Sequence, residues 1–173
     1  MKGLIHIYCG DGKGKSTAAA GLALRSAGAG GKVVFSQFLK DGCSSEIGLL
    51  KGVDNIEVFV CCKPHGFVFS MTEAEREETR CDFSELFDNA VSCAEQGADL
   101  LVLDEIISSC NLDIVCRKKV IEFLKSKPQK LEVVLTGRDP SEELLEIADY
   151  VTEMKKIKHP YDKGTKARKG IEY

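Results

Sequence analysis

The sequence predicts an α/β fold in which helices cover both faces of a mainly parallel sheet of about six strands. Short apolar runs rich in Val, Ile, Leu and Phe alternate with longer amphipathic segments along the 173 residues. Chains that alternate in this way form parallel sheets with right-handed crossover connections. The strand runs are apolar at nearly every position, which indicates strands buried on both faces. The length, without a Pro- or Ser-rich linker, predicts a single domain over residues 1–173.

The expected elements follow one another along the chain as strand and helix in turn. Apolar runs predict strands over 4–9, 33–35, 56–60, 100–103, 133–135 and 150–154. Apolar residues at helical spacing predict helices over 18–27, 72–94, 115–124 and 141–148. Thr72, followed three residues later by Glu75, forms a capping box that should begin the longest helix.

A glycine-rich segment between the first strand and the first helix is the most informative motif. Residues 10–17 read Gly-Asp-Gly-Lys-Gly-Lys-Ser-Thr. In such a loop backbone amides and the positive end of the helix dipole bind an anion, Lys15 reaches the terminal phosphates and Ser16 can hold Mg²⁺. The first glycine of the usual motif is displaced, because Cys9 stands six residues before Lys15 and Gly10 follows it. The segment predicts a nucleoside triphosphate site on a three-layer, RecA-like P-loop NTPase fold, with a glycine-rich surface turn as the alternative.

Polar side chains follow three further strands, at the edge of the sheet where the P-loop is expected. Asp104 and Glu105 end one apolar run, where P-loop proteins place the carboxylates that hold Mg²⁺ or its waters. Arg138 follows another strand and is placed for phosphate or transition-state charge, with a surface salt bridge as the alternative. Gln37 and Lys40 follow the second strand, where a ligand at the sheet edge would be contacted.

Net charge and hydropathy exclude several classes of partner. The chain has 24 Lys and Arg against 27 Asp and Glu, a formal net charge of −3, without the basic patch typical of nucleic-acid binding. Only the stretch 155–169 is locally basic, which suits an anionic ligand or a solvated tail. No apolar segment approaches the roughly 20 residues of a membrane span, and there is no signal-peptide pattern. We therefore expect a cytoplasmic protein that binds neither nucleic acid nor membranes.

The 8 cysteines lack the spacing of a disulfide framework, so we expect free thiols. Cys61, Cys62 and His65 could form part of a zinc site. No second Cys/His pair completes such a site, so zinc is the disfavoured interpretation.

Taken together, the motifs resemble the P-loop type of ATP:corrinoid adenosyltransferase, also called cob(I)alamin or cob(I)yrinic acid a,c-diamide adenosyltransferase. The segments that carry the resemblance, in order, are residues 10–17, 37–40, 66–67, 103–106, 136–138, 148–149, 151–153, 158–160 and 169–173. They span nearly the whole chain. The P-loop variant with its displaced glycine and the Lys158-His159-Pro160 tail are specific to that family, whereas the acidic pair and the Thr136-Gly137-Arg138 segment are common among nucleotide-binding sheets.

The resemblance implies an enzyme that transfers the 5′-deoxyadenosyl group from ATP to the cobalt(I) of a corrinoid, in adenosylcobalamin synthesis or salvage. Cobalt would attack C5′ of the ribose and expel intact triphosphate, so catalysis needs donors along all three phosphates. No general base is required, because cobalt(I) is the nucleophile and carries no proton. ATP and the corrinoid are then substrates, and Mg²⁺ accompanies the triphosphate.

The resemblance also implies roles for individual residues. Those expected to bind ATP or the corrinoid are Gly10, Asp11, Gly12, Lys13, Gly14, Lys15, Ser16, Thr17, Gln37, Lys40, Lys158 and His159. Those expected to act in catalysis are Lys15, Phe67, Phe69 and Arg138, and those expected to hold Mg²⁺ are Ser16, Asp104 and Glu105. Phe67 and Phe69 match positions that wall off the cobalt and remove its axial ligand, which makes cobalt(I) easier to form. The alternative is that both are ordinary core residues.

A homodimer and an electron donor such as a flavoprotein are further implications of the resemblance. Phe69 stands where members usually carry tryptophan, residues 107–112 lack the aromatic and amide residues that often follow the acidic pair, and the stretch before the P-loop is shorter than the N-terminal arm of longer members. These departures bear on which corrinoid is accepted. Two other classes stay open: a RecA-like ATPase or kinase in which Glu105 could serve as base, and a non-catalytic nucleotide-binding module.

The C-terminal tail, residues 158–173, is rich in Lys and Gly and has neither a helical nor an alternating period. We expect it to order over bound nucleotide or corrinoid. A disordered basic end is the alternative, because chain termini are usually mobile.

Overall fold

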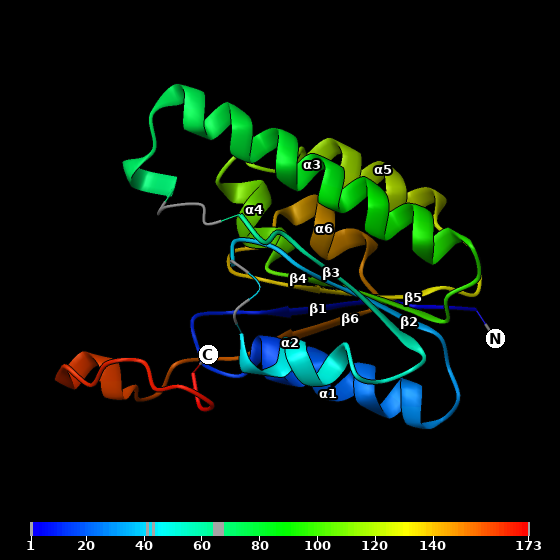
Figure 1. Cartoon of the computed structure of the whole chain (residues 1–173), viewed down its shortest axis with the longest axis horizontal. Coiled ribbons are helices and arrows are strands. Elements are labelled where there is room, and N and C mark those ends of the chain that lie inside the picture. Colours follow the sequence, from blue (N-terminus) through cyan, green and yellow to red (C-terminus); the bar gives the residue numbers. More distant parts are fainter. Residues whose placement is uncertain (1, 41, 43, 64–67, 173) are drawn as a thin grey trace.

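Six parallel strands form the middle layer of the molecule in a computed structural model that describes residues 2–40, 42, 44–63 and 68–172 (Figure 1). The strands are β1 (Ile5–Cys9), β2 (Val33–Gln37), β3 (Ile56–Val60), β4 (Leu100–Asp104), β5 (Glu132–Thr136) and β6 (Tyr150–Glu153). They lie in the order β3-β2-β4-β5-β1-β6, and every pairing is parallel. The predicted α/β class is confirmed, and the sheet is wholly rather than mainly parallel.

Helices cover the sheet on both faces, as predicted (Figure 1). One face carries α1 (Lys15–Gly28) and α2 (Ser45–Leu50); the other carries α3 (Glu73–Glu95), α4 (Ile106–Asn111), α5 (Arg117–Ser126) and α6 (Glu142–Ile147). Two short 3₁₀ helices, η1 (Val68–Ser70) and η2 (Pro160–Lys163), lie outside these layers. The sequence did not predict α2 and α4, which have six residues each, although it did predict α6 of the same length within residues 141–148. So few residues display a helical period only weakly.

The capping box predicted at the start of the longest helix is present. The Thr72 backbone amide donates to Glu75 Oε2 at 2.7 Å, and the Glu75 amide donates to Thr72 Oγ1 at 3.3 Å. Two amides that the first turn of α3 would otherwise leave without a partner are thereby satisfied, which typically contributes about 1 kcal/mol to helix stability.

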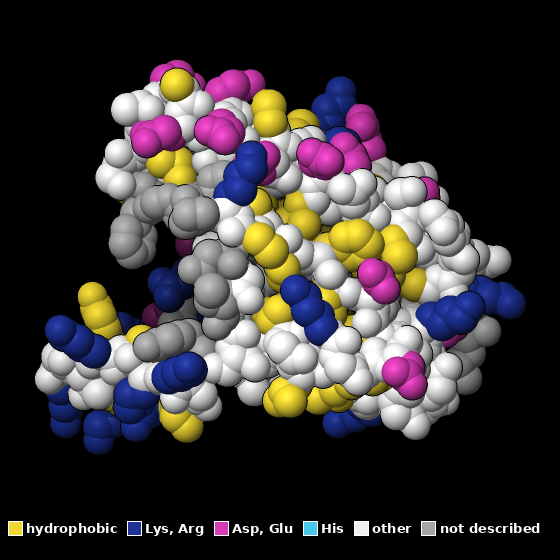
Figure 2. All heavy atoms as spheres, in the orientation of Figure 1, with side chains coloured by type: hydrophobic (Ala, Val, Ile, Leu, Met, Phe, Trp, Pro, Cys, Tyr) yellow, Lys and Arg dark blue, Asp and Glu magenta, His cyan; other side chains and the backbone are white. Residues whose placement is uncertain are grey.

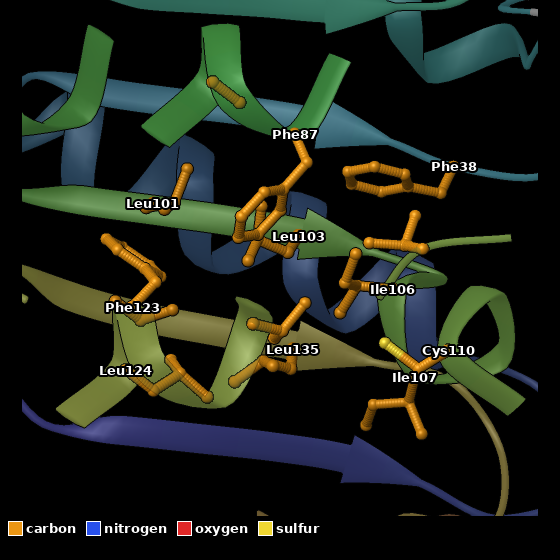
Figure 3. Packing of buried hydrophobic residues seen from close by; sticks show 14 of the residues in the cluster. Phe38, Phe87, Leu101, Leu103, Ile106, Ile107, Cys110, Phe123, Leu124 and Leu135 are labelled. Atoms are coloured by element: carbon orange, nitrogen blue, oxygen red, sulfur yellow. The ribbon is translucent and has the colours of Figure 1, made fainter. Parts of the chain in front are cut away.

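The central strands are apolar at nearly every position because each contributes side chains to two hydrophobic cores, one on either face of the sheet. In β4, Leu101 and Leu103 belong to the core under α3 to α6, whereas Leu100 and Val102 belong to the core under α1 and α2. Figure 3 shows Phe87 of α3 near Leu101 and Leu103 in the first of these cores. Each such side chain contributes roughly 1.5–3 kcal/mol by leaving water, so both faces of β4 must be apolar.

The strand β6 departs from this pattern, because all of its residues are exposed. It lies at the edge of the sheet and pairs only with β1. Tyr150 stacks on His6 of β1 with ring centroids 4.6 Å apart. The expectation that helices bury every strand is therefore wrong for β6: an edge strand has only one neighbouring strand, and here its side chains meet solvent.

Candidate active site

The predicted site residues on the P-loop and at the ends of β2, β4 and β5 meet at the carboxyl edge of the sheet. Because the strands are parallel, β1, β2, β4 and β5 all end at this edge. Gln37 lies opposite Asp104 in the β2–β4 pairing, and Tyr8, just before the end of β1, lies opposite Thr136 of β5. The P-loop, which follows β1, is thus adjacent to the acidic pair that follows β4.

The backbone conformation of the P-loop explains its displaced glycine. Gly10 and Gly14 have φ angles of 103° and 113°, a region that residues with a side chain rarely adopt. Cys9 is still part of β1, where it is buried and pairs in register with Glu153. The turn therefore begins one residue later than in the usual motif, and this explains why glycine stands at position 10.

Lys15 is folded into the loop that it follows. Its Nζ donates to the carbonyl oxygens of Gly10 at 2.8 Å and Gly12 at 2.9 Å, and the residue is 8% exposed. Burial lowers the pKa of Lys15 below its usual range, and the carboxylate of Glu105 opposes that shift. The ammonium is therefore held inside the phosphate loop as a poorly solvated positive charge, suited to an anionic ligand.

Asp104 is the most buried charge of the site. It is 0% exposed and accepts from three side chains: Thr136 Oγ1 to Oδ1 at 2.7 Å, and Gln37 Nε2 at 3.0 Å and Lys40 Nζ at 3.3 Å to Oδ2. Lys40 Nζ also donates to Ser16 Oγ at 3.3 Å and so joins β4 to the P-loop. A buried carboxylate is tolerated only when it is paired and hydrogen-bonded, and these donors meet that need.

Thr136 belongs to this network although it was not predicted as a site residue. Besides donating to Asp104, its hydroxyl accepts from the backbone amide of Glu105 at 2.8 Å. Thr136 is the last residue of β5, as Gln37 is of β2 and Asp104 of β4. The signal in the sequence was a threonine at the end of an apolar run, and the structure shows that it is buried.

Glu105 points to a different set of partners from Asp104. Its φ of 62° is left-handed and turns the chain from β4 into α4. Its Oε2 accepts from Ser108 Oγ at 2.7 Å. In the part of the chain that the structure describes, no three His, Cys, Asp or Glu side chains are grouped as a metal site. This supports neither a zinc centre nor a carboxylate cluster among those residues; His65 lies outside them.

Arg138 follows β5 at the carboxyl edge of the sheet and is exposed. Its backbone is tied to α4, since its amide donates to Ser108 Oγ at 3.3 Å and its carbonyl accepts from Asn111 Nδ2 at 2.9 Å. Among the described residues no ion pair involves its guanidinium, so the salt-bridge alternative has no support there. Burial is the main cause that lowers the pKa of Lys15, and the positive charge of Arg138 lowers it further. The charge of Arg138 is therefore felt in the P-loop.

Of the two phenylalanines expected to wall off the cobalt, only one can be placed. Phe67 lies outside the described residues. Phe69 stands on η1 and is 87% exposed. A core role is therefore wrong for Phe69, because a core side chain is almost fully removed from water.

The chain after β6 returns to the P-loop. The Gly12 amide donates to the carbonyl of Met154 at 2.6 Å, and the Lys156 amide donates to Asp11 Oδ1 at 2.9 Å, which lowers the pKa of Asp11. Further on, Glu172 Oε1 lies 3.8 Å from Lys13 Nζ. The structure thus brings the tail and the phosphate loop together, although they are far apart in sequence.

Lys158 and His159 lie just before and at the start of η2. His159 Nδ1 accepts from the Tyr161 amide at 3.1 Å and caps that helix. In the described residues no hydrogen bond or ion pair joins Lys158 or His159 to the P-loop. Figure 2 shows Lys and Arg side chains gathered on the C-terminal segment, and the surface is hollowed between this segment and the part of the molecule that carries η1.

No helix among the described residues is both long and apolar enough to cross a membrane.

Comparison with known proteins agrees with the geometry of the site. The family model for the ATP:corrinoid adenosyltransferase BtuR/CobO/CobP matches residues 1–173. The corrinoid adenosyltransferase of Escherichia coli K12 is 33% identical over 99% of this chain and 86% of its own length. A corrinoid adenosyltransferase from Sinorhizobium is 34% identical over 99% of this chain and 81% of its own length. That of Salmonella typhimurium, named CobA, is 32% identical over 99% of this chain and 86% of its own length. The chain therefore belongs to the ATP:corrinoid adenosyltransferase family.

Proposed function

We propose that this chain transfers the 5′-deoxyadenosyl group of ATP to the cobalt(I) of a corrinoid and releases triphosphate, in adenosylcobalamin synthesis or salvage. The observation that carries the proposal is the match to the corrinoid adenosyltransferase family along the entire chain. The P-loop with its buried Lys15 supports the ATP half of the reaction.

The chemistry asks the protein mainly to stabilise a leaving group. The electron pair of cobalt(I) forms a bond to C5′, the C5′–O5′ bond breaks, and its electron pair leaves on the triphosphate. Negative charge therefore grows on a group that is already highly charged. Lys15, Lys13, Arg138 and the amides of the P-loop are the donors that we assign to it. Among these, Lys15 is buried in the loop, whereas Lys13 and Arg138 are exposed at its rim.

We assign Mg²⁺ to Ser16 and Asp104, with Glu105 acting on its waters. Two features fit a cation there. The Lys40 ammonium already lies 3.3 Å from both Ser16 Oγ and Asp104 Oδ2, so the two groups already share one positive charge. In addition, Gln37 Oε1 is buried with no hydrogen-bond partner among the described residues, which makes it an acceptor for a metal-bound water. When bound, Mg²⁺ would neutralise charge on the triphosphate.

We assign the corrinoid to the hollow between the C-terminal segment and the part of the molecule that carries η1 (Figure 2). Phe69 of η1 has an exposed apolar ring that is not needed for the core, which suits the role of walling off the cobalt. Gln37, Lys40, Lys158 and His159 keep their assignment to ATP or corrinoid contacts. A homodimer, a flavoprotein reductant, a cytoplasmic location and the absence of nucleic-acid binding are proposed on the family resemblance and the composition alone.

Product analysis tests the proposal. The protein is incubated with ATP, Mg²⁺ and chemically reduced cob(I)alamin, the visible spectrum is followed for the cobalt–carbon bond, and the phosphates are separated by ion exchange. We expect adenosylated corrinoid and triphosphate in equal amounts. ADP with phosphate or a phosphorylated acceptor would instead identify an ATPase or kinase, and the absence of any product would indicate a nucleotide-binding module. Heat-inactivated protein is the control for chemical adenosylation.

A further inference from the structure

We propose that Lys40 occupies the metal position in the nucleotide-free protein and that its ammonium moves to the phosphates when the metal and ATP bind. Lys40 would then be a positioning residue that makes the binding of the two ligands mutually dependent. The inference rests on the proposed Mg²⁺ assignment and goes beyond it, because it gives one residue two alternative partners.

The contacts of Lys40 carry the proposal. Its Nζ lies 3.3 Å from Ser16 Oγ and 3.3 Å from Asp104 Oδ2, one on the P-loop and one at the end of β4. A hydroxyl and a carboxylate brought together from these two elements are the protein groups that hold Mg²⁺ in P-loop proteins. The ammonium therefore supplies the positive charge that the metal would supply, on the same two oxygens.

The backbone before Lys40 is fixed, so the side chain is the part that can move. Phe38 is fully buried, its ring lies 6.0 Å from that of Phe83, and its amide donates to the carbonyl of Asp104 at 2.9 Å. Leu39 then adopts a left-handed φ of 56°. The Lys40 side chain itself is 33% exposed. It thus has solvent on one side, into which the ammonium can move while its backbone stays beside the site.

Charge balance explains why the ammonium should stay until both ligands arrive. Asp104 is fully buried, and without a cation the donors left to it among the described residues would be the neutral ones of Gln37 and Thr136. A divalent ion that arrives alone must displace the ammonium into water. Until the ammonium leaves, its positive charge repels the ion. If a triphosphate is present, the displaced ammonium gains a new anionic partner. Metal and ATP therefore favour each other's binding, and such coupling is reciprocal.

Metal binding without nucleotide tests the first half of the proposal. Mn²⁺ serves as the probe, and the free ion is measured by electron paramagnetic resonance in Lys40→Met, which keeps most of the stem and removes the charge. We expect Mn²⁺ to bind on the order of tenfold more tightly than to the wild type. The matched control is Lys51→Met, an exposed lysine at the end of α2, which changes net charge equally and should leave the affinity unchanged. Equal or weaker binding in Lys40→Met overturns the proposal.

ATP binding at saturating Mg²⁺, measured by calorimetry, tests the second half. Under these conditions the affinity of Lys40→Met for ATP should fall on the order of tenfold, and that of Lys51→Met should not change. An unchanged ATP affinity in Lys40→Met would overturn the transfer of the ammonium to the phosphates. Lys40→Gln repeats both measurements if the methionine variant does not fold. Adding Ser16→Ala to Lys40→Met should abolish the tightened Mn²⁺ binding. If tight binding persists in the double variant, the metal lies elsewhere and the proposal is rejected.

These outcomes are separate from the proposed reaction. A protein that binds ATP but fails to adenosylate a corrinoid would still show both effects of Lys40, because neither measurement contains corrinoid. Conversely, an active adenosyltransferase without these effects would reject the role of Lys40 alone.

Discussion

The backbone amide of Gly12 donates a 2.6 Å hydrogen bond to the carbonyl oxygen of Met154, the residue that follows β6. A Cβ atom on residue 12 would lie 2.4 Å from this oxygen, so the contact requires glycine. The phosphate loop is consequently braced by the last strand of the sheet. Glycine at this position serves the packing of the loop against β6 as well as access for the phosphates.

Replacing Gly12 by alanine should therefore destabilise the protein and weaken ATP binding. The added Cβ would meet the Met154 carbonyl, which is backbone and cannot move away cheaply, and we expect a loss of about 1–3 kcal/mol in the free energy of unfolding. The matched control is Gly21→Ala in α1, where nothing lies within 4 Å of the added Cβ. Alanine there should stabilise by about 0.4–1 kcal/mol. Urea unfolding and ATP calorimetry measure both variants; the same sign in both would contradict the steric argument.

Lys15→Met should abolish measurable ATP binding without lowering the melting temperature. The variant removes the ammonium that lies in the P-loop, while burial already disfavours the charge, as the lowered pKa of Lys15 indicates. An apolar side chain of similar length should therefore be tolerated by the fold. Calorimetric titration with ATP and thermal unfolding are the two measurements, and Lys32→Met, an exposed lysine before β2, is the control. ATP affinity close to that of the wild type would remove the P-loop from the proposed mechanism.

Phe69→Ala should slow adenosylation most when the reaction starts from cobalt(II). That route requires loss of the axial ligand, which an apolar wall favours, whereas pre-formed cobalt(I) has already lost it. Because the ring is 87% exposed, the melting temperature should not change. Rates from cobalt(II) with a protein reductant and from chemically reduced cobalt(I) are compared. Leu49→Ala, which removes another exposed apolar side chain, is the control. Equal losses on both routes would argue against the wall.

The ion pair between Arg168 and Glu172 in the tail should survive mild acid. A side-chain hydrogen bond from Arg168 is the main cause that lowers the pKa of Glu172 to about 2, from an ordinary value of 4.5. A depressed carboxylate pKa contributes stability that is fully present above the ordinary value and is lost as the pH falls through the folded value. The contact should thus persist to about pH 4.5 and disappear toward pH 2.

Carbon-13 NMR of the Glu172 carboxyl measures this directly. The wild-type titration midpoint should lie near 2, and Arg168→Gln should move it toward 4.5. Lys13→Gln is the comparison, since Lys13 lies 3.8 Å away and is a lesser cause, and its effect should be smaller. A wild-type midpoint near 4.5 would mean that the Arg168–Glu172 pair is not formed in solution.

Local patterns in the sequence determined most of the elements and the position of the phosphate loop. The apolar runs, the Thr72 capping box and the phosphate loop each lie within a short stretch of chain, where residue order alone sets backbone preference and burial. Lys15 and Ser16 could be assigned for the same reason, because the loop that positions them is continuous in sequence. The helices α2 and α4 were missed, whereas α6 of the same length was predicted. Helices this short show only a weak period and depend on packing against the sheet.

Only the tertiary structure decided which side chains share the site. Lys40 reaches Asp104 because β2 and β4 are neighbours in the sheet, and Thr136 joins them because β5 lies on the other side of β4. The exposure of Phe69 and the Gly12–Met154 contact likewise depend on how distant segments pack. A sequence specifies local conformation through neighbouring residues, whereas the order of strands follows from burying the two cores together. That cooperative packing brings the Lys40 ammonium, the Ser16 hydroxyl and the buried Asp104 carboxylate to one place.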